Sequence, residues 1–291
     1  MTTPIRNLQT SSQLLSELLE QPVRVLDSPT TGKVGELDAQ DTYERTDPKT
    51  GKVVRAVLGD DLFGDLAFRQ RVAQAARDLA ASGASFSGCQ ENDSVNKDLW
   101  TLGYGGRMQV RKFLEAGKLG SPAVALKDIF EHGRRYGFEC ASAMMVLFHK
   151  AILDTVGDTI FDKMFTEPAY LKIFRWELKD NDYLELEQIE QGKSDLVPGS
   201  HYYYKNPDAS AANSAFGGEN VVYLGSENGQ RMFYAHGVCG AKGTYLVSED
   251  ELIASLSSLR RMGATTAPFR DTFTYSIDAK RLAAKAQQLA A

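Results

Sequence analysis

The sequence contains few of the residues that build metal centres or disulfide frameworks. It has three cysteines, Cys89, Cys140 and Cys239, and only four histidines, and no two cysteines form a CxxC pair. We therefore expect no metal site and no structural zinc. Because three is an odd number, at least one thiol stays free or pairs between molecules, and a reducing compartment is the simplest setting.

Long apolar runs and a strong charge of either sign are also missing. No apolar stretch approaches the roughly 20 residues of a membrane span, so we expect no membrane partner. Residues 1–6 are polar and lack the apolar core of a signal peptide. We therefore take the cytoplasm as the default location. The net charge of −5, with 24% charged and 43% hydrophobic residues, is ordinary for a soluble globular protein and gives no reason to expect nucleic acid.

The order of predicted elements favours an α+β fold. Helical patterns and end signals predict helices at residues 66–81, 121–133, 140–157, 248–262 and from 278 onward. Strand-like runs occur at residues 171–178, 183–189, 201–204, 220–224, 231–234, 244–247 and 273–277. Strands that cluster after helices are typical of α+β proteins. We expect an N-terminal accessory segment, residues 1–60, followed by one main domain, residues 61–291.

Cys140 stands where a polar segment gives way to an apolar helix. The residues behind it that share helical spacing are Met144, Met145, Phe148, Ile152 and Val156. Free N–H groups and the positive end of the helix dipole favour a thiolate at such a place. A thiolate is a nucleophile, so covalent catalysis is the first hypothesis. The alternative is a small buried residue, which describes most cysteines at helix starts.

A nucleophilic cysteine needs a proton acceptor, and a predicted hairpin supplies two candidates. If Asn228-Gly229 is a two-residue turn, Val221 pairs with His236, and Glu219 projects diagonally from the same face. A three-residue turn would place Glu219 and His236 on opposite faces. Taken alone, Glu219 after two glycines is better explained as a turn carboxylate, and His236 before Gly237 fits a strand-end histidine as well.

Glu139 is a second carboxylate, directly before Cys140 in the chain. It is a candidate to accept the thiol proton or to steer an incoming amine. The backbone N–H groups of Cys140 and Ala141 are candidates to hold an oxyanion. Together these groups form the set that acyl transfer through a thiol requires.

Five blocks of sequence in one order carry a family resemblance. They are Phe138-Glu139-Cys140-Ala141-Ser142-Ala143, Asp154-Thr155-Val156-Gly157, Tyr204-Lys205-Asn206-Pro207, Gly218-Glu219-Asn220-Val221 and Tyr234-Ala235-His236-Gly237. With them, residues 65–265 resemble the bacterial spore-coat protein-glutamine γ-glutamyltransferases (transglutaminases). The resemblance implies a papain-like cysteine hydrolase-type core, in which a nucleophile-bearing helix packs on an antiparallel sheet. It also implies Cys140 as nucleophile, Glu219 and Glu139 as acid/base groups, a site role for His236, and no calcium or other cofactor.

The activity that the resemblance implies is protein crosslinking through a cysteine thioester. The partners would be proteins bearing glutamine and lysine side chains, and a source organism that forms spores would make a role in sporulation and a spore-coat location plausible. Residues 1–60, 84–120 and 208–216 depart from the family pattern, which leaves the identity of the substrates open. Two alternatives stay open: a cysteine hydrolase (a peptidase or glutamine deamidase) on the same scaffold, and a coat or scaffold protein without activity.

Overall fold

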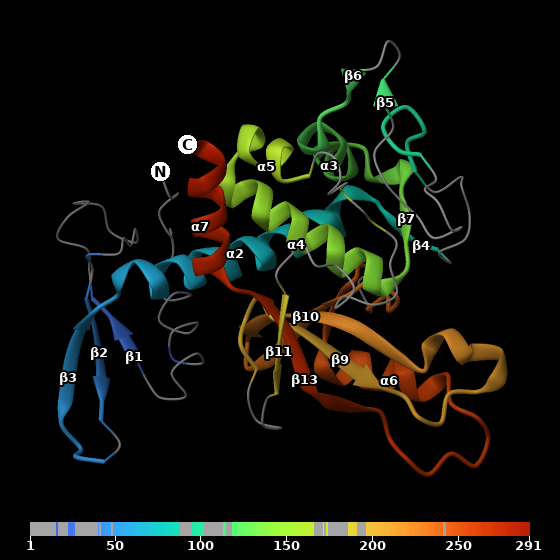
Figure 1. The fold of residues 1–291 in the computed structure, drawn as a ribbon. Helices are drawn as coiled ribbons and strands as arrows, with labels where there is room; N and C mark the ends of the chain where they lie inside the picture. The colour runs from blue at the N-terminus through green and yellow to red at the C-terminus, as the bar shows by residue number, and fades with distance from the viewer. Residues whose placement is uncertain are drawn as a thin grey trace.

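The structure is a computed structural model of the chain (Figure 1). It describes residues 49–87, 95–101, 118–165, 196–240 and 243–291, with shorter pieces at 16, 23–26, 40, 42–47, 113–114, 171, 173 and 186–190. Cys89 and most of the strand predicted at residues 171–178 lie outside the described residues. Leu171 and Ile173, which are described, are not in a strand.

A six-stranded sheet forms the base of the main domain. Its strands lie in the order β12–β11–β10–β9–β13–β8, and every neighbouring pair is antiparallel. Their bounds are β8 Leu186–Glu190, β9 His201–Lys205, β10 Gly218–Glu227, β11 Gln230–Ala235, β12 Leu246–Ser248 and β13 Phe269–Ile277. The tight turn between β10 and β11 makes that pair antiparallel, whereas β13 reaches β9 and β8 from a distant part of the chain.

Five helices gather on one face of this sheet, and α6 lies on the other (Figure 1). The bounds are α2 Gly59–Ser82, α3 Pro122–Glu131, α4 Cys140–Val156, α5 Asp158–Met164, α6 Glu249–Ser258 and α7 Ala279–Ala290, with 3-10 turns η2 Gly133–Arg135 and η5 Ala211–Phe216. Within the described residues, no helix combines the length and apolarity needed to cross a bilayer.

Three small sheets complete the architecture. Strands β1 Val23–Val25, β2 Thr42–Thr46 and β3 Val53–Val57 form a separate antiparallel sheet before α2. Strands β4 Ser85–Phe86 and β7 Gly137–Phe138 pair in parallel, and β5 Phe113–Leu114 pairs with β6 Lys118–Leu119. The β4–β7 pair matters most for the site, because β7 leads directly into α4.

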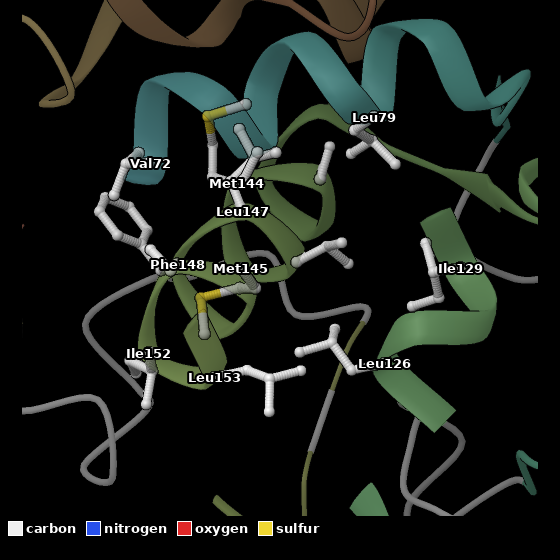
Figure 2. Packing of buried hydrophobic residues seen from close by; sticks show 14 of the residues in the cluster. Val72, Leu79, Leu126, Ile129, Met144, Met145, Leu147, Phe148, Ile152 and Leu153 are labelled. Atoms are coloured by element: carbon white, nitrogen blue, oxygen red, sulfur yellow. The ribbon is translucent and has the colours of Figure 1, made fainter. Parts of the chain in front are cut away.

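Helix α4 is the central element of the helical layer. Nearly all its residues from Cys140 to Leu153 are buried, which is typical of a helix that is apolar on every side. Its side chains pack between Val72 and Leu79 of α2 and Leu126 and Ile129 of α3 (Figure 2). Such packing fixes the position and direction of α4, and with them the position of the residue at its first turn.

The sheet is apolar on both faces, and strand alternation divides its residues between two clusters. Val222 and Leu224 of β10 belong to the cluster on the helical side, while Val221 and Tyr223 pack with α6 on the other side. Even-numbered residues of β10 therefore face α4. This alternation determines which side chains of β10 reach the start of α4.

Most helix ends agree with the sequence signals. Ser121 caps α3, Gly157 ends α4, and Ser248 with Glu251 forms the predicted capping box of α6. Two bounds were wrong. Helix α2 begins at Gly59 rather than at Leu66, and helix α6 ends at Ser258 rather than near residue 262. Early helix ends are common because terminal turns have few internal hydrogen bonds.

His149 makes the acid stability of this fold testable. It is fully buried in α4, its Nδ1–H donates to the Met145 carbonyl over 2.7 Å, and its Nε2 has no hydrogen-bond partner among the described residues. Burial lowers the pKa of His149 from 6.5 to about 4. A base with a depressed folded pKa loses stability as pH falls from 6.5 toward 4, because the unfolded state binds the proton first.

We expect His149→Leu to protect the protein against acid. Between pH 8 and pH 5 the wild type should lose roughly 2 kcal/mol more unfolding free energy than the variant, measured by urea denaturation at both pH values. The measurement at pH 8 serves as the control for packing, since His149 is neutral there in both states. Equal losses for the two proteins would contradict the assignment.

Candidate active site

Cys140 is the first residue of α4, and Glu139 is the N-cap of that helix. The Glu139 carboxylate accepts hydrogen bonds from the N–H groups of Ala141 (2.7 Å) and Ser142 (2.6 Å) and from the Ser142 hydroxyl. A cap of this kind satisfies N–H groups that have no partner within the helix, and the helix dipole favours its negative charge. The cap places a carboxylate that is 1% exposed next to a cysteine that is 7% exposed.

This cap corrects one prediction about the oxyanion. The N–H of Ala141 was expected to be free to hold it, but in the structure this group donates to Glu139. The donor that does reach the sulfur comes from the sheet: Asn220 Nδ2 donates to Cys140 Sγ over 3.2 Å. An oxyanion forming on the carbon attached to Sγ would lie close to the same donor.

Glu219 is the second carboxylate beside the sulfur. It is 1% exposed, it accepts a hydrogen bond from Gly237 N–H over 2.8 Å, and it is hydrogen-bonded to the Cys140 thiol. Burial, together with the charge of Glu139, raises the pKa of Glu219 to about 8, and the hydrogen bonds only partly oppose this effect. A Cβ at Gly237 would come within 2.6 Å of Glu219 Oε2, so a larger residue there would displace this carboxyl group.

The thiol itself is not the pre-formed thiolate that its place at a helix start suggested. Burial raises the pKa of Cys140 well above its ordinary value, and the charges of Glu219 and Glu139 raise it further. Hydrogen bonds from Asn220 lower this pKa but do not reverse the shift. The resting site therefore holds a protonated thiol beside two carboxyl groups whose own pKa values are raised by burial, and the thiol must lose its proton to act as a nucleophile.

The predicted pairing of Val221 with His236 was wrong. The turn at Asn228-Gly229 does have two residues, but the pairing slips by one between Tyr223 and Gly225, so Val221 pairs with Ala235. Gly225 adopts φ +99°, a conformation that suits glycine. The strand accommodates its extra residue at this position. The bulge brings Gly237 rather than His236 opposite Glu219.

His236 lies near the site, but its two ring nitrogens are engaged elsewhere. Nε2 donates to the Ser85 carbonyl over 3.1 Å, so Nδ1 accepts from the Tyr234 hydroxyl over 2.6 Å. Burial lowers the pKa of His236 to about 4, which keeps the ring neutral near pH 7. The structure thus brings together Cys140, Glu219 and Glu139, while His236 supports the β4 backbone beside them.

Sequence reasoning missed two residues of the site. Asn220 was seen only as part of a motif, and His201, which had no motif around it, lies with Nε2 2.7 Å from Asn220 Oδ1. Tyr203 of β9 pairs with Asn220, and its ring covers Gly218, where a Cβ would come within 2.2 Å of it. The sequence signal that could have found Asn220 was the alternation of side chains along a strand, because residues 218, 220 and 222 share the face of β10 that meets α4.

No cluster of three or more metal-binding side chains occurs in the part of the chain that the structure describes. The chemical groups at the site are therefore a thiol, two carboxylates, an amide and a tyrosine. A buried thiol flanked by proton acceptors at the start of a helix, packed on an antiparallel sheet, defines a cysteine-dependent acyl-transfer site.

Comparison with known proteins agrees with this chemistry. The model of the protein-glutamine gamma-glutamyltransferase family matches residues 57–287. Proteins of that name are similar to this chain in Bacillus pumilus strain SAFR-032 (32% identity; 72% of this chain and 75% of the relative) and in Bacillus cereus strain B4264 (34%; 74% and 70%). A solved transglutaminase from Geobacillus stearothermophilus, without its C-terminal extension, superposes with a TM-score of 0.64 at 27% identity over 77% of this chain and 96% of that one.

The chain belongs to the protein-glutamine γ-glutamyltransferase family. It is a transferase that works by acyl transfer, and the predictions of family, enzyme class and α+β fold with a papain-like core are confirmed. The assignment of individual site residues stays a prediction.

The raised pKa of Glu219 predicts a stability effect with a definite sign. A carboxyl group whose folded pKa is raised contributes stability below its unfolded pKa of 4.5 and loses it as pH rises through about 8. In Glu219→Gln, which keeps an acceptor for Gly237, this loss is absent. From pH 6 to pH 9 the free energy of unfolding of the variant, measured with urea, should rise by roughly 2 to 3 kcal/mol relative to that of the wild type. A difference that does not change with pH would contradict burial of an ionisable Glu219.

Proposed function

We propose that Cys140 forms the thioester through which this enzyme crosslinks proteins. The observation that carries the proposal is a buried thiol at the start of α4 that receives a hydrogen bond from Asn220 and lies within the electrostatic reach of two buried carboxyl groups, Glu219 and Glu139. The Cys140 sulfur attacks the carboxamide carbon of a protein glutamine, ammonia leaves, and a thioester forms. The amine of a protein lysine then attacks this thioester, expels the sulfur and forms an ε-(γ-glutamyl)lysine bond.

Glu219 is the group best placed to move the protons of both half-reactions. It takes the thiol proton as the sulfur attacks and returns it to the departing nitrogen, which leaves as ammonia. In the second half-reaction it takes a proton from the attacking amine and returns it to the sulfur. Glu139 already accepts three hydrogen bonds, so we assign it mainly to holding the helix start and to raising the pKa of Glu219.

The substrates we propose are proteins that present glutamine and lysine side chains. Transfer to an amine rather than to water requires a shielded thioester. Aromatic side chains gather beside the site: Phe86 stacks on Phe216 with ring centroids 5.7 Å apart, and Phe86 and Phe138 both contact His236. These rings supply apolar surface around His236, and we propose that they help to keep water from the thioester.

We propose two further features. Residues 1–60 form an accessory segment and residues 61–291 the catalytic domain, which is supported by the separate β1–β2–β3 sheet and by the family match from residue 57. The location we propose is the cytoplasm, or the spore coat if the source organism sporulates, which the Bacillus relatives support.

The nucleophile assignment is tested by Cys140→Ala. We expect incorporation of a fluorescent primary amine into a glutamine-rich protein, with a calcium chelator present, to fall at least about 1000-fold, because no other group forms the thioester. Cys239→Ala removes an exposed free cysteine and is the matched control, which should retain activity. Crosslinking by a folded Cys140→Ala protein would end the proposal, and release of glutamate without amine incorporation in wild type would indicate a hydrolase.

The role of Glu219 is tested by the pH dependence of acylation. Only the ionised carboxylate accepts the thiol proton, and its pKa of about 8 means that this form declines as pH falls. We expect kcat/KM for ammonia release to decrease about tenfold per pH unit below pH 8. A flat profile from pH 8 to pH 5 would contradict the role of Glu219 as base, whereas Cys239→Ala should reproduce the wild-type profile.

A further inference from the structure

The side chain of Asn220 lies between the proposed nucleophile and a buried histidine. Its Nδ2 donates to Cys140 Sγ over 3.2 Å, and its Oδ1 lies 2.7 Å from His201 Nε2. The three residues come from three elements, α4, β10 and β9, and neither Asn220 nor His201 belongs to the proton-transfer steps above. The amide is therefore held from both ends, which fixes its position over the sulfur.

The charge of the sulfur sets the direction of these hydrogen bonds. A thiolate only accepts, so the Asn220 amide must present its NH₂ group to Cys140 and its oxygen to His201. His201 must then carry its proton on Nε2. Burial lowers the pKa of His201 to about 4, so the ring is neutral and donates at Nε2 without adding charge. The His201 ring also packs against Tyr275, with centroids 5.4 Å apart, which restrains its orientation.

The groups around Cys140 show why such a donor matters. The charges of Glu219 on β10 and Glu139 on the same helix both disfavour a negative charge on the sulfur. Tyr203 of β9 lies nearby, and burial raises its pKa, so this side chain is neutral. Asn220 opposes the effect of the two carboxyl groups from β10, through its side chain and its backbone N–H. A neutral, oriented donor can stabilise the thiolate without neutralising the carboxylate that must act as base.

We propose that Asn220 is a further catalytic residue that stabilises the Cys140 thiolate, and that His201 is a positioning residue that orients the Asn220 amide. The proposal rests on Cys140 being the nucleophile. The same donor serves both half-reactions, since the thiolate is generated in the first and released when the amine expels it in the second. It also lies where it can donate to the oxyanion, because Glu139 occupies the N–H of Ala141.

The test measures the thiol directly, without glutamine or amine. The rate of Cys140 alkylation by iodoacetamide is followed from pH 6 to pH 10 by mass spectrometry of the peptide containing Cys140. At pH 7.5 we expect Asn220→Ala to react about 10- to 100-fold more slowly than wild type, the effect of one lost hydrogen bond to a charged group. Asn220→Asp, with nearly the same shape, should react more slowly still, because it adds a third carboxylate.

The order of alkylation rates, with Asn220→Asp slower than Asn220→Ala, distinguishes a residue that donates to the thiolate from one that only packs. If Asn220 served only to fill space, Asp would resemble wild type and Ala would be the more impaired variant, and this result would overturn the proposal. An unchanged alkylation profile in folded Asn220→Ala would overturn it as well, while leaving the thioester mechanism intact. Loss of the mechanism would instead appear as crosslinking by Cys140→Ala, so the two failures are distinguishable.

His201 gives an independent pair of variants. His201→Phe keeps the ring against Tyr275 but removes the donor to Asn220, and we expect alkylation to slow several-fold. His201→Gln restores an N–H near the position of Nε2 and should recover most of the rate. Equal rates in the two variants, with similar thermal unfolding, would remove His201 from the proposal. This pair also decides the question if Asn220→Ala does not fold.

Discussion

The arrangement of the whole site depends on the contact between the Glu139 carboxylate and the first turn of α4. Three donors of that turn are satisfied by one side chain, so the helix begins at Cys140, the proposed nucleophile. The same contact sets the charge of the site, because it anchors one carboxylate beside Cys140 and raises the pKa of its partner, Glu219. A structural cap and a catalytic environment are thus one feature of the chain.

The sheet supplies the other site residues, and a β-bulge determines where they lie. The bulge at Gly225 shifts the pairing of β10 and β11 by one residue before it reaches the site. As a result Glu219 receives the N–H of Gly237 beside Cys140, and its neighbour Asn220 donates to the sulfur. A regular hairpin would place these groups differently, because a slip of one residue exchanges the two faces of a strand.

Local signals in the sequence predicted what depends on neighbours in the chain. Capping residues such as Ser121 and Ser248, and the glycine at position 157, mark helix ends through contacts within a few residues. The family blocks predicted Cys140 and its carboxylates as site residues, which stays a prediction. The register of β10 and β11 was not predictable from the turn alone, since the bulge lies four residues before it. Asn220 and His201 were missed because their roles arise only when strands from distant segments meet a helix.

Burial changes the pKa values of the groups at this site, which suits them to proton transfer but lowers the stability of the protein. Removing Glu219 from water disfavours its charged form, and the same burial disfavours a thiolate at Cys140. Because a negative charge on Glu219 raises the pKa of Cys140, the two groups titrate as a coupled pair. A carboxylate with a pKa near 8 is a far better match to a thiol than one near 4.5, so proton transfer between them needs less energy. The instability that burial causes at high pH is therefore the same property that suits Glu219 to the role of base that we propose, and the neutral amide of Asn220 can assist the sulfur without removing that property.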